Sequence, residues 1–353
     1  MTNLNNFDAT ANGDPIDWAS TVKGDSFGGG FPGTVDKLTN TDLLVLQAMG
    51  YDVPSAIGPS QSSGSVALFL ANLNNIATAG FSISDTSTNV ATNLDTLEQN
   101  LAKLSGIALT DNNALAITST QLGNDASVLG RIGGTYALGI TLSANSTIFN
   151  ASPNEHIASI TGLGGLNTVV YSEPSINFNV SISGNTTTVV DNVGSYGAET
   201  INQIQRINFS DGTALALDFQ QGQNSYSTVM MIGTAFGASK ISTYFAPGIS
   251  LYDAGQTNTQ LASTIEQLGL IESQIGSTNN KAWVDFVYQN VVGVAPDVLT
   301  EAVYVGDLNN GTYTKATLLA FAAGVADVGG GTLASQIGLV GLQAHGLSYT
   351  PVA

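Results

Sequence analysis

The chain has 353 residues and a formal net charge of −18, because 26 Asp and Glu residues stand against only 8 Lys and Arg residues. A surface with so few cations cannot follow a phosphate backbone, so we expect no nucleic-acid partner. The absence of cysteine excludes disulfides and Cys-ligated metal sites, and no apolar run reaches the roughly 20 residues of a membrane span.

Residues 1–53 form a loop-rich segment that ends in one predicted helix before Gly50. This segment has neither the basic nor the apolar region of a Sec signal peptide, so we expect none. Its acidic residues Asp14, Asp17 and Asp25 are candidate calcium ligands, because carboxylate oxygens suit this hard cation. Residues 54–65 are rich in Ser, Pro and Gly and are interpreted as a linker.

Residues 66–156 contain three similar units, each with a helical stretch, a glycine and a short β-prone run. The glycines are Gly80, Gly106 and Gly134, which are 26 and 28 residues apart. This period predicts stacked helix–strand repeats, since one unit is too short to bury its own apolar face. Leu97 and Leu101 fall on the expected apolar face of the second helix.

The pattern changes to strands over 157–220 and back to helices over 221–353. Alternating apolar residues over 176–182 predict a strand with one buried face. Helix limits are expected at Gly293, Asp297 and Thr314, and a tail follows the last helix. The predicted fold class is an α+β multidomain protein with a helix–strand repeat stack, a β-rich middle segment and a small α-helical C-terminal domain.

One segment approaches a metal-binding repeat. Residues 162–170 follow the calcium-binding nonapeptide pattern, with Asn167 in the place of the aspartate. Asn167 is therefore a candidate calcium ligand, although a neutral amide is a weaker ligand than a carboxylate. Calcium is the one cofactor that the sequence suggests.

Three sequence patterns of catalytic or cofactor-binding sites are absent or incomplete in this chain. The two histidines, His156 and His345, lie too far apart in the chain for the HExxH motif of zinc proteases. Residues 24–28 match G-x-S-x-G and residues 28–33 match G-x-G-x-x-G, but no helix is expected after either motif. We predict no catalytic residue.

Three segments resemble known families. Residues 160–219, with ITGLGGLNTVVYSEPS, INQIQRINFSDGT and ALALDF, resemble the β-segment that flanks calcium-repeat (RTX) regions in type I-secreted bacterial proteins. Residues 229–327, with YFAPG, LYDAG, FVYQNVVGVAPD and LNNG, are similar to the domain of unknown function DUF4214, although Val294 replaces the usual Arg. Residues 14–53 resemble the C-terminal end of matrixin-like secreted zinc metalloprotease domains, without the zinc-binding helix.

These resemblances imply a non-enzymatic structural or interaction protein, exported by a type I system to the extracellular space or cell surface. The implied partners are further copies of the chain or cell-surface and matrix components, and the type I exporter during secretion. Two alternatives stay open. One is a remnant or accessory chain of a secreted zinc metalloprotease, and the other is a glycan-binding or adhesive module that uses Tyr, Asn and Asp residues of the strand region.

Overall fold

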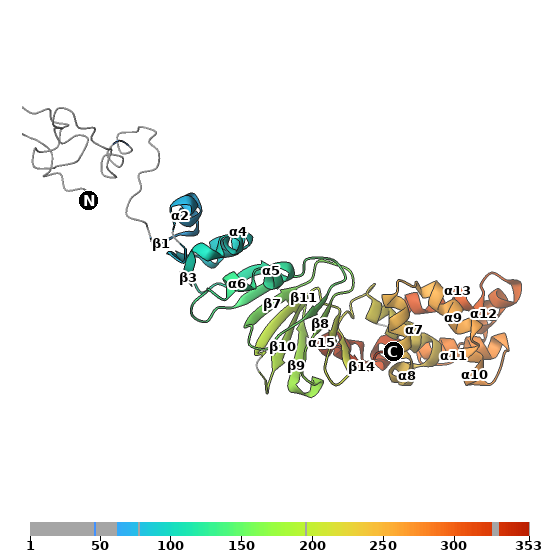
Figure 1. Ribbon diagram of the computed structural model, residues 1–353. Coiled ribbons are helices and arrows are strands. Elements are labelled where there is room, and N and C mark those ends of the chain that lie inside the picture. Colours follow the sequence, from blue (N-terminus) through green and yellow to red (C-terminus); the bar gives the residue numbers. More distant parts are fainter. Residues whose placement is uncertain (1–45, 47–61, 77, 195, 327–331, 353) are drawn as a thin grey trace, which may run out of the picture. The chain divides into compact units, whose positions relative to one another are not determined.

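The computed structural model describes residues 46, 62–76, 78–194, 196–326 and 332–352, which form helices and several sheets and confirm the α+β multidomain class (Figure 1). Nearly all of the predicted segment 1–53 and most of the linker lie outside the described residues, and so do Asp14, Asp17 and Asp25. The chain divides into two units, Met1–Asp111 with Ser127–Gly134, and Asn112–Ala126 with Thr135–Ala353.

The first unit is a stack of helix–strand repeats around a parallel sheet. Its strands are β1 (Ser63–Gly64), β2 (Phe81–Asp85) and β3 (Leu104–Leu109), in that order. Its helices are α2 (Val66–Ala71), α3 (Ser87–Thr92) and α4 (Leu94–Gln99), with short 3₁₀ turns η2 (Leu73–Asn75) and η3 (Leu101–Lys103). An isolated bridge from Ile107 to Ile132 continues the parallel stack. The predicted alternation of helix and strand is confirmed for the first two repeats, whereas the strand expected after Gly134 belongs to a sheet of the second unit.

The helices of this stack are shorter than the sequence predicts. Each six-residue helix ends at an asparagine, Asn72, Asn93 or Asn100, whose side-chain amide donates to the carbonyl four residues earlier. This local hydrogen bond competes with continuation of the helix. The helical stretches of the first two repeats are therefore not continuous helices, and Leu101 falls in a 3₁₀ turn.

The second unit begins with two sheets between which the chain alternates. The six-stranded sheet has the order β4 (Leu115–Thr118), β5 (Leu138–Thr141), β7 (Ile157–Thr161), β11 (Ala198–Asn202), β10 (Thr186–Asp191), β9 (Phe178–Ser183). The five-stranded sheet has the order β14 (Leu347–Tyr349), β13 (Ala214–Ala216), β12 (Arg206–Asn208), β8 (Thr168–Val170), β6 (Ile148–Asn150). We call the part that these sheets form the roll. The predicted boundary after residue 156 falls inside it.

Parallel pairing gives the roll its successive coils. Strands β5, β7 and β11 pair in parallel in one sheet, while β6, β8 and β12 pair in parallel in the other. The short helices α5 (Ser119–Asn124) and α6 (Ala126–Leu129) lie between β4 and β5 in the chain, and the hairpin β9–β10 is inserted between β8 and β11. Alternate residues point inward, so that Ile140, Ile160, Val169, Ile201 and Ile207 are buried.

The predicted alternation over 176–182 holds only from Phe178. Residues 175–177 form a 3₁₀ turn, η4, in which Asp211 accepts hydrogen bonds from the backbone N–H and hydroxyl of Ser175. This turn leaves Ile176 86% exposed. The expectation that Ile176 belongs to the buried face of a strand is therefore wrong.

The helical region follows the roll in the same unit. Its helices are α7 (Asn224–Phe236), α8 (Ile241–Asp253), α9 (Asn258–Gln267), α10 (Leu270–Ile275), α11 (Asn280–Val292), α12 (Val298–Asn310), α13 (Lys315–Val325), α14 (Thr332–Gln336) and α15 (Leu339–His345), with the 3₁₀ turn η5 (Ala238–Lys240). Helix α7 is almost wholly buried at the centre. The predicted limits are confirmed, since Gly293 ends α11 and the side chains of Asp297 and Thr314 cap α12 and α13.

The predicted C-terminal tail contains two short helices, α14 and α15, and ends in a strand. After α15 the chain returns to the roll, and β14 pairs antiparallel with β13. Gly346 makes this turn possible, because it has φ +75° and a Cβ there would lie 2.5 Å from the carbonyl oxygen of Ala216. The helical region thus begins and ends on one sheet. Across the described ranges, no helix has both the length and the apolarity needed to cross a bilayer.

Candidate functional site

The helical region presents an exposed apolar face on helix α12. Among described helices of eight or more residues, only α12 contains no buried residue. Val298 and Leu299 are each 80% exposed and Val303 is 59% exposed. Ala302 and Gly306 continue the same side of the helix at the spacing of one and two turns from Leu299. We call these five residues the α12 face.

Other residues of α12 hold the helix against the protein. Tyr304, Val305 and Leu308 are partly buried and pack against the core of the helical region. Apolar residues therefore lie on both sides of α12, although a surface helix normally needs only one apolar stripe. The second stripe is the α12 face, which contacts solvent in the single chain.

Ionic and polar contacts fix α12 to α11. Lys281 Nζ lies 2.7 Å from Asp285 Oδ2 on α11 and 2.6 Å from Glu301 Oε2 on α12. Asn280 also donates to the amide oxygen of Asn309 at 2.9 Å. Hydrogen bonds to Asp285 and Glu301 raise the pKa of Lys281 and keep it charged. These contacts give the α12 face a defined position on the helical region.

An apolar pocket lies between α11, α12 and α13. Its volume is about 130 Å³, and its lining includes Trp283, Tyr288, Tyr304, Phe321 and Val325. The rings of Tyr288 and Tyr304 are 6.5 Å apart. Phe321 and Val325 are 45% and 41% exposed, so they form an open rim. The pocket can receive an apolar group, and its lining residues are aliphatic or aromatic, with the hydroxyl-bearing rings of Tyr288 and Tyr304 as its polar side chains.

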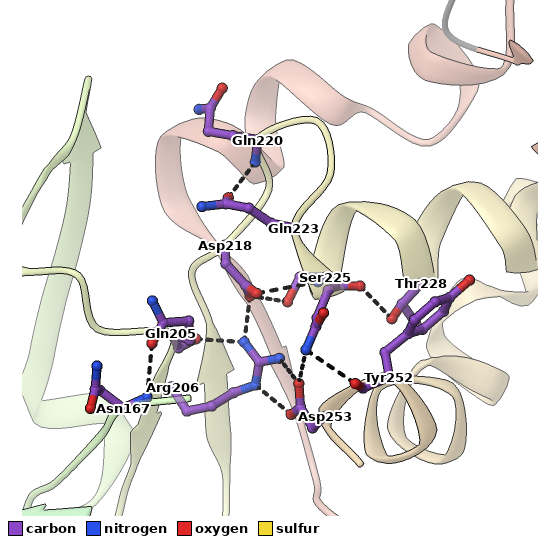
Figure 2. Close-up of polar contacts among 11 residues, drawn as sticks. Asn167, Gln205, Arg206, Asp218, Gln220, Gln223, Ser225, Thr228, Tyr252 and Asp253 are labelled. Atoms are coloured by element: carbon purple, nitrogen blue, oxygen red, sulfur yellow. Dashed lines mark hydrogen bonds and ion pairs between the residues drawn. The ribbon is translucent and has the colours of Figure 1, made fainter. Parts of the chain in front are cut away.

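A buried arginine joins the roll to the helical region. Arg206 on β12 is 3% exposed, and its guanidinium lies between the carboxylates of Asp218 and Asp253 (Figure 2). The distance from Nη2 to Asp253 Oδ1 is 2.6 Å. Burial alone would lower the pKa of Arg206, but the two carboxylates outweigh it and raise the pKa.

The partners of Arg206 come from separate elements. Asp218 follows β13 and also accepts from the hydroxyl of Ser225 at the start of α7 (Figure 2). Asp253 ends α8 and accepts from the side-chain amide of Asn224. The guanidinium and both carboxylates have hydrogen-bond partners within the protein, so the network fits a structural joint between sheet and helices.

The structure places Asn167 inside the roll, where its side chain is fully buried. The carboxamide oxygen accepts from the backbone N–H of Thr147 at 3.0 Å, and the amide nitrogen donates to the carbonyls of Gly164 and Gln203 at 3.1 Å each. A nitrogen that faces two carbonyls cannot bind a cation. The geometry of Asn167 therefore does not fit a calcium ligand, and calcium binding at Asp14, Asp17 and Asp25 stays a prediction.

The roll also contains a buried acid, Glu199. Glu199 on β11 is 2% exposed and accepts from the hydroxyl of Tyr171 at 2.8 Å. Burial raises the pKa of Glu199 to about 7, and the charges of Asp191 and Glu155 add to this rise. Within the described ranges, no three His, Asp or Glu residues form a group that could hold a metal ion. Because its pKa is about 7, Glu199 changes protonation near neutral pH while it is buried in the core of the roll.

Sequence reasoning missed the α12 face, Arg206 and Glu199. A signal for the α12 face existed, because apolar residues surround the helix on both sides over 298–308. Arg206 is one of two arginines in the chain, but nothing near it in sequence indicates its partners. No family model, no curated protein and no solved structure matches the chain.

Proposed function

We propose that the chain is a non-enzymatic structural or interaction protein of the extracellular space or cell surface, exported by a type I system, and that it binds protein through the α12 face. The observation that carries the binding role is the exposure of Val298, Leu299 and Val303 on a helix whose other side is already packed. Contiguous exposed apolar residues of this kind mark interaction sites.

The energetics favour a contact at this face. Each Å² of apolar surface removed from water contributes about 25 cal/mol, and three aliphatic side chains at this exposure offer a substantial area. The helix is held by Lys281 and by its packed side, so little ordering cost remains on binding. The α12 face is therefore preorganised for binding.

The remaining features support a scaffold role. Arg206 and Asn167 are buried polar residues whose partners lie within the protein, and they stabilise joints in the roll. The low content of charged residues, 10%, and the absence of cysteine suit a chain that crosses an exporter unfolded and then folds outside. A chain folded in this way outside the cell would expose the α12 face to extracellular proteins.

Fractionation of the native host tests this function. We expect the chain in the culture supernatant or surface fraction, and in the cytoplasm after the host's type I exporter is inactivated. Removal of the exporter is the suitable comparison, because truncation of the C-terminus would remove β14 from its sheet. Cytoplasmic location in the parent host, or hydrolysis of casein by the purified chain, would contradict the proposal.

A further inference from the structure

We propose that the pocket between α11, α12 and α13 binds a small uncharged aromatic molecule with a single ring. This site goes beyond the proposed binding of protein at the α12 face and does not depend on it. Tyr304 lines the pocket from the side of α12 that packs against the core. Leu299 and Ala302 precede Tyr304 by five and two residues, so the helical period puts them on the opposite side of α12. The pocket and the α12 face are therefore separate.

The pocket extends into the core of the helical region. Trp283, Val287 and Leu318 are buried members of that core, and they also line the pocket. Phe321 and Val325 form the open rim through which a guest can enter. Because three helices hold these side chains in place, the pocket is formed before a guest binds.

The lining selects an apolar guest. Its side chains are aliphatic or aromatic, whereas an ordered buried water is typically held by about three hydrogen bonds. Water in this pocket is therefore held weakly. An apolar guest that displaces such water gains contacts with the walls and gives up no strong hydrogen bond.

The volume sets the size of the guest. It is about 130 Å³. In another protein, an engineered cavity of about 150 Å³ with aliphatic and aromatic walls stays dry and binds benzene. The pocket thus has room for one six-membered ring with a small substituent, whereas the acyl chain of a lipid is too long to be enclosed.

The walls favour a ring over an aliphatic guest of the same size. Each of the three helices contributes aromatic residues to the lining, namely Trp283 and Tyr288 from α11, Tyr304 from α12 and Phe321 from α13. The rings of Tyr288 and Tyr304 are inclined to each other by 45°. Inclined rings present both edges and faces to a guest, and aromatic groups attract one another in edge-to-face and offset arrangements.

The surroundings of the pocket disfavour a charged guest. Among the described residues, no charged side chain lines it. The charged groups at the contact between α11 and α12 are Lys281, Asp285 and Glu301, and they are paired with one another. A charged guest would lose its hydration without gaining a counter-charge.

Titration of the full chain with toluene, followed by nuclear magnetic resonance, tests the proposal. We expect a Kd of about 1 mM or tighter for this guest. Benzylammonium and benzoate carry the same ring with a positive and a negative charge, and they should bind at least about tenfold more weakly. This comparison uses the parent chain, so it does not depend on the folding of a variant.

A pair of variants places the site. Ala322 lines the pocket from α13 and is half-buried, so Ala322→Leu fills space that the ring needs. We expect this variant to bind toluene at least about tenfold more weakly than the parent. Ala302→Leu makes the same change on the exposed side of α12 and should bind toluene as the parent does. Circular dichroism checks that both variants fold.

Three results would overturn the proposal: no binding of toluene up to its solubility limit, tighter binding of benzylammonium than of toluene, or equal affinity of the parent and Ala322→Leu for toluene. The second result would assign the pocket to a cation over the ring faces, which the charge of −18 would attract. None of these results concerns the α12 face or export, so the proposed function and the pocket are tested separately.

Discussion

Asn167 connects three successive coils of the roll through one carboxamide. Its partners are Thr147 before β6, Gly164 before β8 and Gln203 before β12. Its backbone also exchanges two hydrogen bonds with Gln205. An amide fits this position because it donates and accepts at once, whereas a carboxylate can only accept. The residue that resembles a calcium ligand in sequence thus acts by hydrogen bonding.

The first prediction concerns Asn167→Asp. The new carboxylate would face the carbonyl oxygens of Gly164 and Gln203, so we expect the free energy of unfolding to fall by about 2–4 kcal/mol. One oxygen of the new carboxylate and these two carbonyl oxygens would form a hard ligand set, so millimolar calcium should restore part of the loss. Urea denaturation with and without calcium measures both effects. Asn179→Asp on the exposed side of β9 is the control, and an equal loss there would refute the explanation.

The second prediction concerns the pH dependence of stability. The pKa of Glu199 rises from 4.5 to about 7 on folding, because burial disfavours the charged form. Between these values the folded state binds more protons than the unfolded state, so stability falls as pH rises from about 4.5 to 7, by about 3 kcal/mol. Glu199→Gln, which keeps an acceptor for Tyr171, should flatten this part of the profile of unfolding free energy. An unchanged slope would show that other groups cause it.

At the scale of elements, local signals fixed some boundaries and missed others. The caps Asp297 and Thr314 and the terminator Gly293 act within one helical turn, so the sequence predicted these limits correctly. The breaks at Asn93 and Asn100 were missed, because an asparagine inside an apolar helical period gives a weak signal. Which side of α12 is packed depends on α11 and α13, so the α12 face could not be predicted from local pattern alone.

The third prediction compares two leucines that the helical period places on one face. Leu97 is fully buried in α4, whereas Leu101 lies beyond the break at Asn100 and is half-buried. We expect Leu97→Ala to lower the free energy of unfolding by about 3 kcal/mol and Leu101→Ala by less than about 1.5 kcal/mol. Thermal or urea unfolding followed by circular dichroism measures the difference. Equal losses would mean that one continuous helix buries both residues.

At the scale of the molecule, the helical region and the roll share their stability. Strand β14 returns from the last helix to the sheet, and Arg206 ties β12 to the ends of α7 and α8. The sequence predicted strands followed by helices, but it gave no indication of this return, because the pairing joins residues more than one hundred positions apart in the chain. Long-range pairing of this kind has no local pattern.

The fourth prediction is that Arg206→Leu weakens both parts together. The substitution leaves Asp218 and Asp253 without their cation, and we expect a loss of about 3–5 kcal/mol in the free energy of unfolding. Hydrogen exchange should accelerate both in β12–β13 and in α7–α8. Arg131→Leu, at an exposed position in the first unit, is the matched control. Faster exchange confined to the helices would mean that the roll is stable without the joint.

The central claim is that the chain is an extracellular or cell-surface protein that binds protein through the α12 face. Hydrogen exchange of the full chain, alone and mixed with the surface fraction of the native host, tests it most directly. We predict that exchange slows over residues 298–306 in the mixture, while α15 exchanges equally in both samples. Exchange in α12 that the mixture does not change, or protection that appears on another element instead, would contradict the account.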